Sequence, residues 1–412
     1  PILGYLMLAA GAGVIVSNLD PLGKMIEHGF HITGVVPNNE AIVAVAQKVL
    51  GVETMSILVV GLLMNLLIAR FTKFKYVFLT GHHSLFMACL MSAVLGTAGL
   101  SGIELILVGG FLMGAWSAIS PAIGQSYTSK VTDGDEIALG HFGSLGYYLS
   151  AWVAKYVGKA EESTEDIEIP EKWGFLRDST LSTALTMIVF YLIAAIAAGS
   201  EFVSTLSGDM SPYLYAVMSA MNFAVGVTIV YSGVRMILGD LIPAFQGIAT
   251  KIIPNAIPAV DCAVFFTYAP TAVVLGFLSS FIGGIIGMLI LGAVGGVLII
   301  PGLVPHFFCG ATAGIYGNAT GGRRGAAVGA FLNGLAITFL PAMALPVLGQ
   351  LGFQNTTFGD ADFAVMGLVL GNAYEWVGMA GIYGIVAIAA LVLIIPNFIK
   401  TKGKVINYVE ED

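Results

Sequence analysis

The segment SILVVGLLMNLL (residues 56–67) decides the fold class, because its side chains are almost entirely apolar on every face of a helix. Comparable apolar stretches recur along the chain and repeatedly reach the roughly 20 residues that a helix needs to cross about 30 Å of hydrocarbon. A transmembrane β-barrel would instead show alternating segments of about 10 residues. Because lipid offers no partner to a free backbone amide, these stretches are expected to be helices.

The composition excludes an ordinary soluble enzyme. Of the 412 residues, 57% are hydrophobic and 10% are charged, whereas a soluble domain carries about 25% charged residues. The net charge of −8 is concentrated in residues 161–178 and 410–412, so it says little about partners, and no nucleic-acid partner is expected. The three cysteines lack metal-ligand or disulfide-framework spacing, so neither kind of site is expected. Pro1 stands where an initiator methionine belongs, and we expect the natural start to be missing.

We expect an all-α polytopic membrane protein with about 10–11 transmembrane helices and several re-entrant hairpins. The spans read from the sequence are residues 2–19, 52–71, 76–97, 102–121, 179–200, 212–238, 269–291, 293–315, 325–348 and 379–397. The Pro- or Gly-interrupted stretches read as hairpins are residues 34–50, 123–150, 254–268 and 358–377. If Arg70, Lys73 and Lys75 are cytoplasmic, 15 of the 17 basic residues lie on the cytoplasmic side, as the positive-inside rule requires.

The sequence also indicates an internal repeat of opposite polarity. GVVPNNEAIV (34–43) matches NAIPAVDCAV (255–264) with Glu40 aligned to Asp261, and further along the chain His82 aligns with His306. Five expected crossings separate the copies, so the copies face opposite sides of the membrane, as in alternating-access transporters. We therefore expect a first repeat over residues 1–178, including a cytoplasmic loop at 151–178. An inverted second repeat covers residues 179–412, with its first span as a connector.

Ionisable groups at membrane depth are costly and by default mark a pathway or a site. Asp261 is the leading candidate, because it lies between two prolines on a broken helix where backbone groups and a carboxylate can converge on a hydroxylated ligand. A helix cap, or a structural pair with Arg235 or another base, is the alternative. Glu40 is its counterpart in the first repeat. His82 and His141 can bind hydroxyls or an anion, and the residue after His82 points about 100° away, so one of the two is expected to pack structurally.

The motifs that the sequence lacks constrain its source of energy. It has no GxxxxGK[ST] motif for ATP, no GxGxxG motif after a strand and no TVGYG-like filter. No cofactor is expected, and the energy for transport must come from a gradient or a partner protein. The acidic loop GKAEESTEDIEIPEKWGFLRD (158–178) is either the docking segment for such a partner or a solvated connection.

Several stretches together resemble the membrane component IIC of the ascorbate-type phosphotransferase systems. They are YVFLTGHH (76–83), VTDGDEIALGH (131–141), GKAEESTEDIEIP (158–170), GVRMILGDLIPAFQGI (233–248), IIPNAIPAVDCAVFFTYAPTAVVLGF (252–277) and IIPGLVPHFFCGATAGIYGNATGGRRGA (299–326). The similarity covers nearly the whole chain, and the combination of stretches is specific although each alone is not.

The resemblance implies a homodimeric permease in the bacterial inner membrane, with a scaffold domain and a core transport domain that moves as a rigid body. Such a permease releases L-ascorbate or a related sugar acid to a cytoplasmic IIB protein, whose phosphocysteine phosphorylates it, so this component is not itself an enzyme. The binding positions that the resemblance implies are Asn39, Glu40, His82, Phe86, His141, Phe142 and Asp261. Some ascorbate permeases carry glutamine at the two phenylalanine positions and tyrosine at the glutamate position, so the resemblance fixes the fold more firmly than the substrate.

Two other functions compete with phosphotransferase-coupled transport. An ion-coupled secondary transporter of a small hydroxylated anion would use Asp261 or Glu40 as a proton or sodium site. A membrane-embedded enzyme is disfavoured, because the sequence offers no nucleophile with a base and no paired metal ligands.

Overall fold

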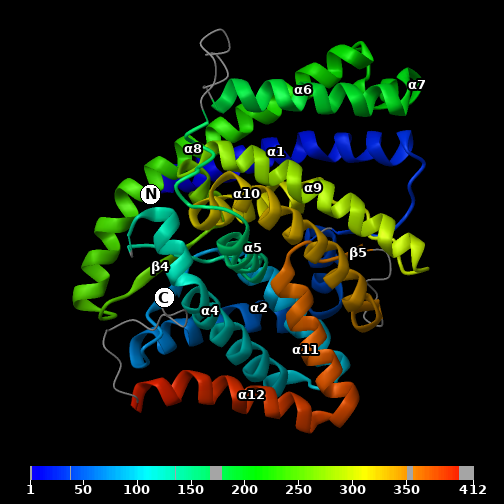
Figure 1. Cartoon of the computed structure of the whole chain (residues 1–412). Helices are drawn as coiled ribbons and strands as arrows, with labels where there is room; N and C mark the ends of the chain where they lie inside the picture. Colours follow the sequence, from blue (N-terminus) through cyan, green and yellow to red (C-terminus); the bar gives the residue numbers. More distant parts are fainter. Residues whose placement is uncertain (1, 38, 135, 168–178, 350–355, 399–412) are drawn as a thin grey trace.

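The chain is a bundle of long helices interrupted by very short strands (Figure 1). The computed structural model describes residues 2–37, 39–134, 136–167, 179–349 and 356–398. Within these residues, seven helices are long and apolar enough to cross a membrane, or eight if the bent pair at 183–207 counts as one span. The chain is therefore a multi-pass membrane protein, and the expected all-α polytopic fold is confirmed.

The helices follow one another from the N-terminus to the C-terminal region. They are α1 (Ile2–Gly29), α2 (Asn39–Phe71), α3 (Gly81–Thr97), α4 (Gly102–Thr132), α5 (Ser144–Val157), α6 (Ser179–Ala198), α7 (Ser200–Ser207), α8 (Pro212–Lys251), α9 (Pro270–Ala293), α10 (Leu303–Gly349), α11 (Ala361–Val377) and α12 (Met379–Ile394). Two 3₁₀-helices, η2 (Cys262–Thr267) and η3 (Ile395–Phe398), complete the helical elements of the described chain.

The spans expected from the sequence correspond to fewer, longer elements. The expected spans at 293–315 and 325–348 both overlap α10, which is kinked where the backbone of Gly321 and Gly322 leaves helical geometry. The expected span at 179–200 is α6, which bends by 117° into α7. The expected span at 76–97 begins with a strand and leaves only 17 helical residues in α3. Whether the four expected hairpins re-enter the membrane stays a prediction.

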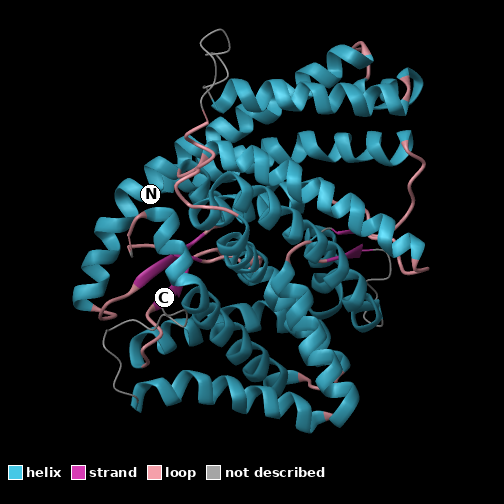
Figure 2. Ribbon diagram, in the orientation of Figure 1, coloured by secondary structure: helices cyan, strands magenta, loops and turns pink. Residues whose placement is uncertain are grey.

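The strands form two small parallel sheets, seen in Figure 2 as two separate magenta groups. The first sheet has the order β2 (Tyr76–Phe78), β4 (Ile257–Val260), β3 (Ala138–Leu139). The second sheet pairs β1 (Val36–Pro37) with β5 (Thr356–Thr357), and an isolated parallel bridge joins Val35 to Ile299 on the other side of β1. Each sheet therefore combines segments that lie far apart in the sequence.

Two amide side chains from long helices satisfy the backbone of the first sheet. Asn65 Nδ2 on α2 donates to the Tyr76 carbonyl (3.1 Å), and the Phe78 amide donates to Asn65 Oδ1 (2.9 Å). Gln125 Nε2 on α4 donates to the carbonyl of Ile137 (3.1 Å), next to β3. The backbone groups of these buried strands cannot hydrogen-bond to water, so amide side chains on the helices bond to them instead.

Close packing of the helices depends on glycine where a ring or a backbone approaches. A Cβ at Gly124 on α4 would lie 1.9 Å from the ring of Tyr148 on α5. A Cβ at Gly276 on α9 would lie 2.4 Å from the carbonyl oxygen of Gly310 on α10. These small residues let α4 approach α5 and let α9 approach α10, as is typical of membrane bundles.

Candidate functional site

The first sheet brings together three of the residues selected from the sequence. Its strands run in parallel, so the residues that follow them share one edge. Asp261 directly follows β4, His82 lies just beyond β2, and His141 lies just beyond β3. His82 Nε2 lies 3.4 Å from Asp261 Oδ2, and Asp261 Oδ1 accepts a hydrogen bond from the Ala263 amide (3.0 Å). Asp261 thus caps η2, as the structural alternative expected, and also pairs with an imidazole.

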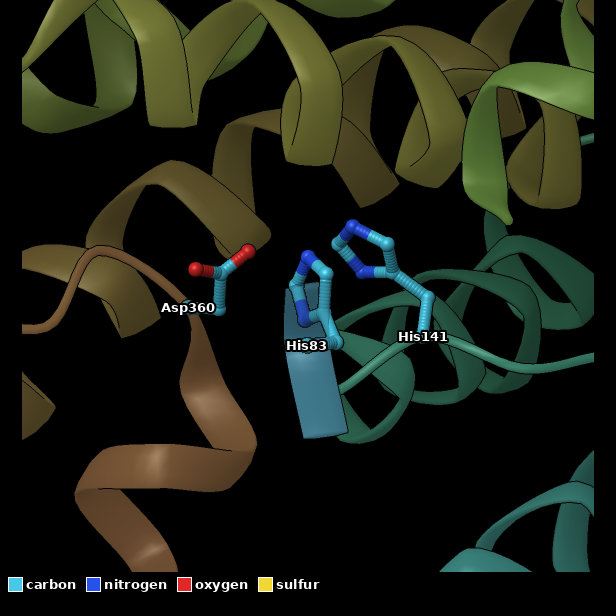
Figure 3. A group of neighbouring side chains, drawn as sticks. All are labelled: His83, His141 and Asp360. Carbon is cyan, nitrogen blue, oxygen red and sulfur yellow. The ribbon is translucent and has the colours of Figure 1, made fainter. Parts of the chain in front are cut away.

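His83 and His141 form the centre of the site. Their ring centroids are 3.7 Å apart, and both side chains are buried. Figure 3 shows the His83 ring between the His141 ring and the carboxylate of Asp360. His82 contacts the same group from its more exposed side, with its ring centroid 4.8 Å from that of His83. Both histidines of the pair at 82–83 therefore belong to the site.

Backbone amides fix which nitrogen of each buried imidazole carries the hydrogen. The Phe142 amide donates to His83 Nδ1 (3.3 Å), and the Gly143 amide donates to His141 Nδ1 (3.2 Å). The Tyr147 hydroxyl also lies 2.9 Å from His141 Nδ1. A nitrogen that accepts from an amide holds a lone pair, so in the neutral ring the hydrogen is on Nε2. The site therefore presents two N–H donors.

This arrangement does not suit a resident metal ion, although the ligand types gather. The ligand atoms of His83, His141 and Asp360 lie within 4.8 Å of one another, as do those of His141, Asp261 and Cys262. A metal-bound histidine normally donates its other N–H to a carbonyl or carboxylate. Here Nδ1 of each ring accepts a hydrogen bond instead of donating one. The nitrogen left for a metal, Nε2, carries the hydrogen and so has no free lone pair. The chemistry fits hydrogen bonding to oxygen atoms of a ligand.

The end of the second sheet meets this centre from the opposite side. Asn39, which begins α2 just after β1, donates from Nδ2 to Asp360 Oδ2 (2.7 Å) and accepts from the Gly359 amide at Oδ1 (2.9 Å). The Cys309 thiol on α10 donates to Asp360 Oδ1 (2.9 Å). Asp360, just beyond β5, is thereby held beside His83 and His141. The carboxyl ends of both sheets converge on one polar cluster.

Aromatic rings line the cluster. Phe363 stacks on His83 (centroids 5.6 Å apart, planes 17° apart), and Phe86 meets the edge of His82 (5.8 Å). Phe142 stacks on Phe78 (4.6 Å) and is fully buried. The polar groups therefore lie against apolar walls, as in most small-molecule sites.

The structure brings together six of the seven site residues expected from the sequence, whose contacts are given above: Asn39, His82, Phe86, His141, Phe142 and Asp261. Glu40 begins α2 together with Asn39, but its side chain lies outside the described residues. Sequence reasoning missed Asp360 and Phe363 as site residues. The signal was available, because FGDADF (358–363) carries two acids in an otherwise apolar stretch.

Comparison with known proteins gives the chain a family. Residues 1–362 match the family described as PTS system sugar-specific permease component, EIIC-GAT. The chain belongs to this family. Among its relatives, this permease chain is 25% identical over 436 residues to the ascorbate-specific PTS system EIIC component of Mycoplasma pneumoniae. That match covers 91% of this chain and 65% of the relative, so the chain spans just under two-thirds of the relative's length. The relationship to a phosphotransferase permease inferred from the sequence is confirmed.

Proposed function

We propose that this permease chain translocates L-ascorbate or a related sugar acid through the polar cluster at the meeting point of the two sheets. The observation that carries the proposal is that two Nε2–H donors, on His83 and His141, lie in one cluster with the carboxylates of Asp261 and Asp360. A sugar acid offers matching groups. Its hydroxyls donate to carboxylates, and its deprotonated oxygen accepts from imidazole N–H groups.

We also propose that the site lies between two inverted repeats, residues 1–178 and 179–412. The strand registers support this. In the Val35–Ile299 bridge, the Val35 amide donates to the Leu298 carbonyl and the Ile300 amide donates to the Val35 carbonyl. In the first sheet Ile257 has the role of Val35. It pairs with Tyr76, and its amide donates to the Lys75 carbonyl. Superposing these ladders relates Val35 to Ile257 and Tyr76 to Ile299.

Under this relationship the polar residues of the two halves correspond. Continued along the chain, the relation of Val35 to Ile257 pairs Asn39 with Asp261, and the relation of Tyr76 to Ile299 pairs His83 with His306. The remaining strands, β3 and β5, correspond in the same way, which relates His141 to Asp360. The central strand of each sheet comes from one half of the chain and its outer strands from the other half: β4 lies between β2 and β3, and β1 lies between β5 and Ile299. Because both sheets end at one cluster, the halves run in opposite directions, which suits alternating access.

Release of the substrate is proposed to occur toward a cytoplasmic IIB protein that phosphorylates it, so this chain contributes binding and movement rather than phosphoryl transfer. A homodimer in the bacterial inner membrane is part of the same proposal. Large apolar side chains on α12 are exposed, including Ile388 and Leu391, and lipid or a second copy would cover them.

The proposal is tested by uptake of radiolabelled L-ascorbate into proteoliposomes, with phosphorylated IIB either inside the vesicles or omitted. We expect accumulation of ascorbate phosphate only when IIB is enclosed, and competition by ascorbate analogues at the outer face. Uptake of unmodified ascorbate at full rate without IIB would refute coupling. If that uptake followed the membrane potential, the ion-coupled alternative would be favoured instead.

A further inference from the structure

Asp362 is a buried carboxylate that the proposed substrate contacts do not use. It lies in the first turn of α11 and is fully buried. Oδ2 accepts from Trp116 Nε1 (3.1 Å) and from the Ser144 hydroxyl (2.8 Å), and Oδ1 accepts from the Leu145 amide (2.9 Å). Three donors on two other helices therefore converge on one carboxylate.

These bonds hold the loop that carries His141. Ser144 and Leu145 are the first residues of α5, directly after that loop, and an acceptor at a helix N-terminus satisfies amides that have no partner within the helix. The Asp362 amide also donates to the carbonyl of Phe142 (3.0 Å). The loop is thus fastened to α11 through both its backbone and the start of the following helix.

The same turn of α11 also reaches the other buried histidine. Phe363, the next residue, stacks on His83, and Asp360, just before the helix, lies beside it. Trp116 extends the contact to α4, the helix whose Gln125 supports the segment before β3. One turn of the second half therefore contacts the surroundings of both buried imidazoles, His83 and His141.

We propose that Asp362 is a positioning residue for the substrate site, which locks the His141 loop and its Nε2–H donor in the binding geometry. The inference rests on the proposed function but concerns a residue that does not touch the substrate. Both carboxyl oxygens matter because an asparagine would offer one acceptor oxygen and turn an NH₂ group toward hydrogen-bond donors. At least one of those donors would then lose its partner, and the loop would loosen.

The test compares the full-length Asp362→Asn variant with wild type and with Asp209→Asn, a matched charge removal at an exposed residue in a distant turn. Hydrogen–deuterium exchange is followed in the peptide covering residues 140–150, and ascorbate binding is measured on the same preparations. We expect exchange in that peptide to be at least tenfold faster and binding about tenfold weaker in Asp362→Asn, with both unchanged in the control. Unaltered exchange and binding in a folded Asp362→Asn protein would overturn the proposal.

Two milder variants keep the test decisive if Asp362→Asn does not fold. Ser144→Ala and Trp116→Phe each remove one donor and leave the carboxylate in place, so each is expected to speed exchange in the same peptide about threefold. No acceleration in either variant would count against the positioning role. The exchange measurement needs no substrate, so a wild-type protein that fails to bind ascorbate would refute the proposed function and leave this inference separately tested.

Discussion

Replacing Asp261 with asparagine removes the negative charge from the site but keeps the oxygen that caps η2. Asparagine and aspartate are equivalent as helix caps, so the bond from the Ala263 amide to Oδ1 is retained. The lost pair with His82 contributes less than about 1 kcal/mol, because the His82 side chain is 58% exposed. The variant should therefore melt close to wild type. Asp261→Ala, which also loses the cap, should be destabilised by about 1 kcal/mol.

Binding should respond much more strongly than stability. A ligand hydroxyl bound to a carboxylate contributes about 1.5–3 kcal/mol, against about 1 kcal/mol for a neutral acceptor. The difference of about 0.5–2 kcal/mol corresponds to roughly a 2- to 30-fold loss of affinity for Asp261→Asn. Scintillation-proximity binding of radiolabelled ascorbate, paired with thermal melting, measures both quantities. A variant that melts normally and binds as tightly as wild type would refute the role of this carboxylate.

Other predictions test the framework of the site. Asn65→Leu removes both hydrogen bonds that this side chain makes with the backbone of β2. It should therefore lower the free energy of unfolding by about 2–4 kcal/mol, whereas the neighbouring Met64→Leu should cost under about 1.5 kcal/mol. Comparable melting of the two variants would contradict the bracing role. Gly124→Ala should prevent normal packing of α4 against α5, because its Cβ would lie 1.9 Å from the Tyr148 ring. Gly13→Ala is the control, because its Cβ would meet nothing within 4 Å. Size-exclusion profiles after detergent extraction should show aggregation of the first variant and a normal peak for the second. Chelation with EDTA should leave ascorbate binding unchanged, because both buried imidazoles accept hydrogen bonds at Nδ1 and carry a hydrogen at Nε2, which leaves no nitrogen for a metal. A loss of binding that zinc restores would show that the site needs a metal ion.

The sequence was informative where charge is scarce. Asp261, His82 and His141 stood out because ionisable groups are rare in such an apolar chain, and the structure brings them to one sheet edge. The same reasoning applied to residues 358–363 would have selected Asp360 and Asp362. Their sequence context resembles that of Asp261, an acid within an interrupted apolar stretch.

The directions in which His82 and His83 point depend on where their helix begins. His82 and His83 were expected to diverge by about 100°, with one of them structural. The helix α3 begins at Gly81, so both residues lie in its first turn, where the chain has just left β2. At such a helix start both side chains reach the polar cluster, one from its exposed side and one from its buried side.

The register of the proposed repeat depends on backbone hydrogen bonds, which the sequence does not show. Matching prolines aligned Pro37 with Pro258, whereas the ladders align Pro37 with Ala259, the next residue along. In a strand, a slip of a single position turns every side chain to the other face. The match by letters paired Glu40 with Asp261, and the ladders pair Asn39 with it. Asn39 is the residue whose amide binds Asp360.

Short strands buried among helices would be unstable alone, because each edge would leave amides and carbonyls without partners. Here each central strand comes from the other half of the chain, and side chains such as Asn65 and Gln125 bond the backbone of the outer strands or the residues beside them. Neither half can therefore form its sheet by itself. Because the polar residues follow these strands directly, the pairing of the strands sets the distances between the imidazoles and the carboxylates.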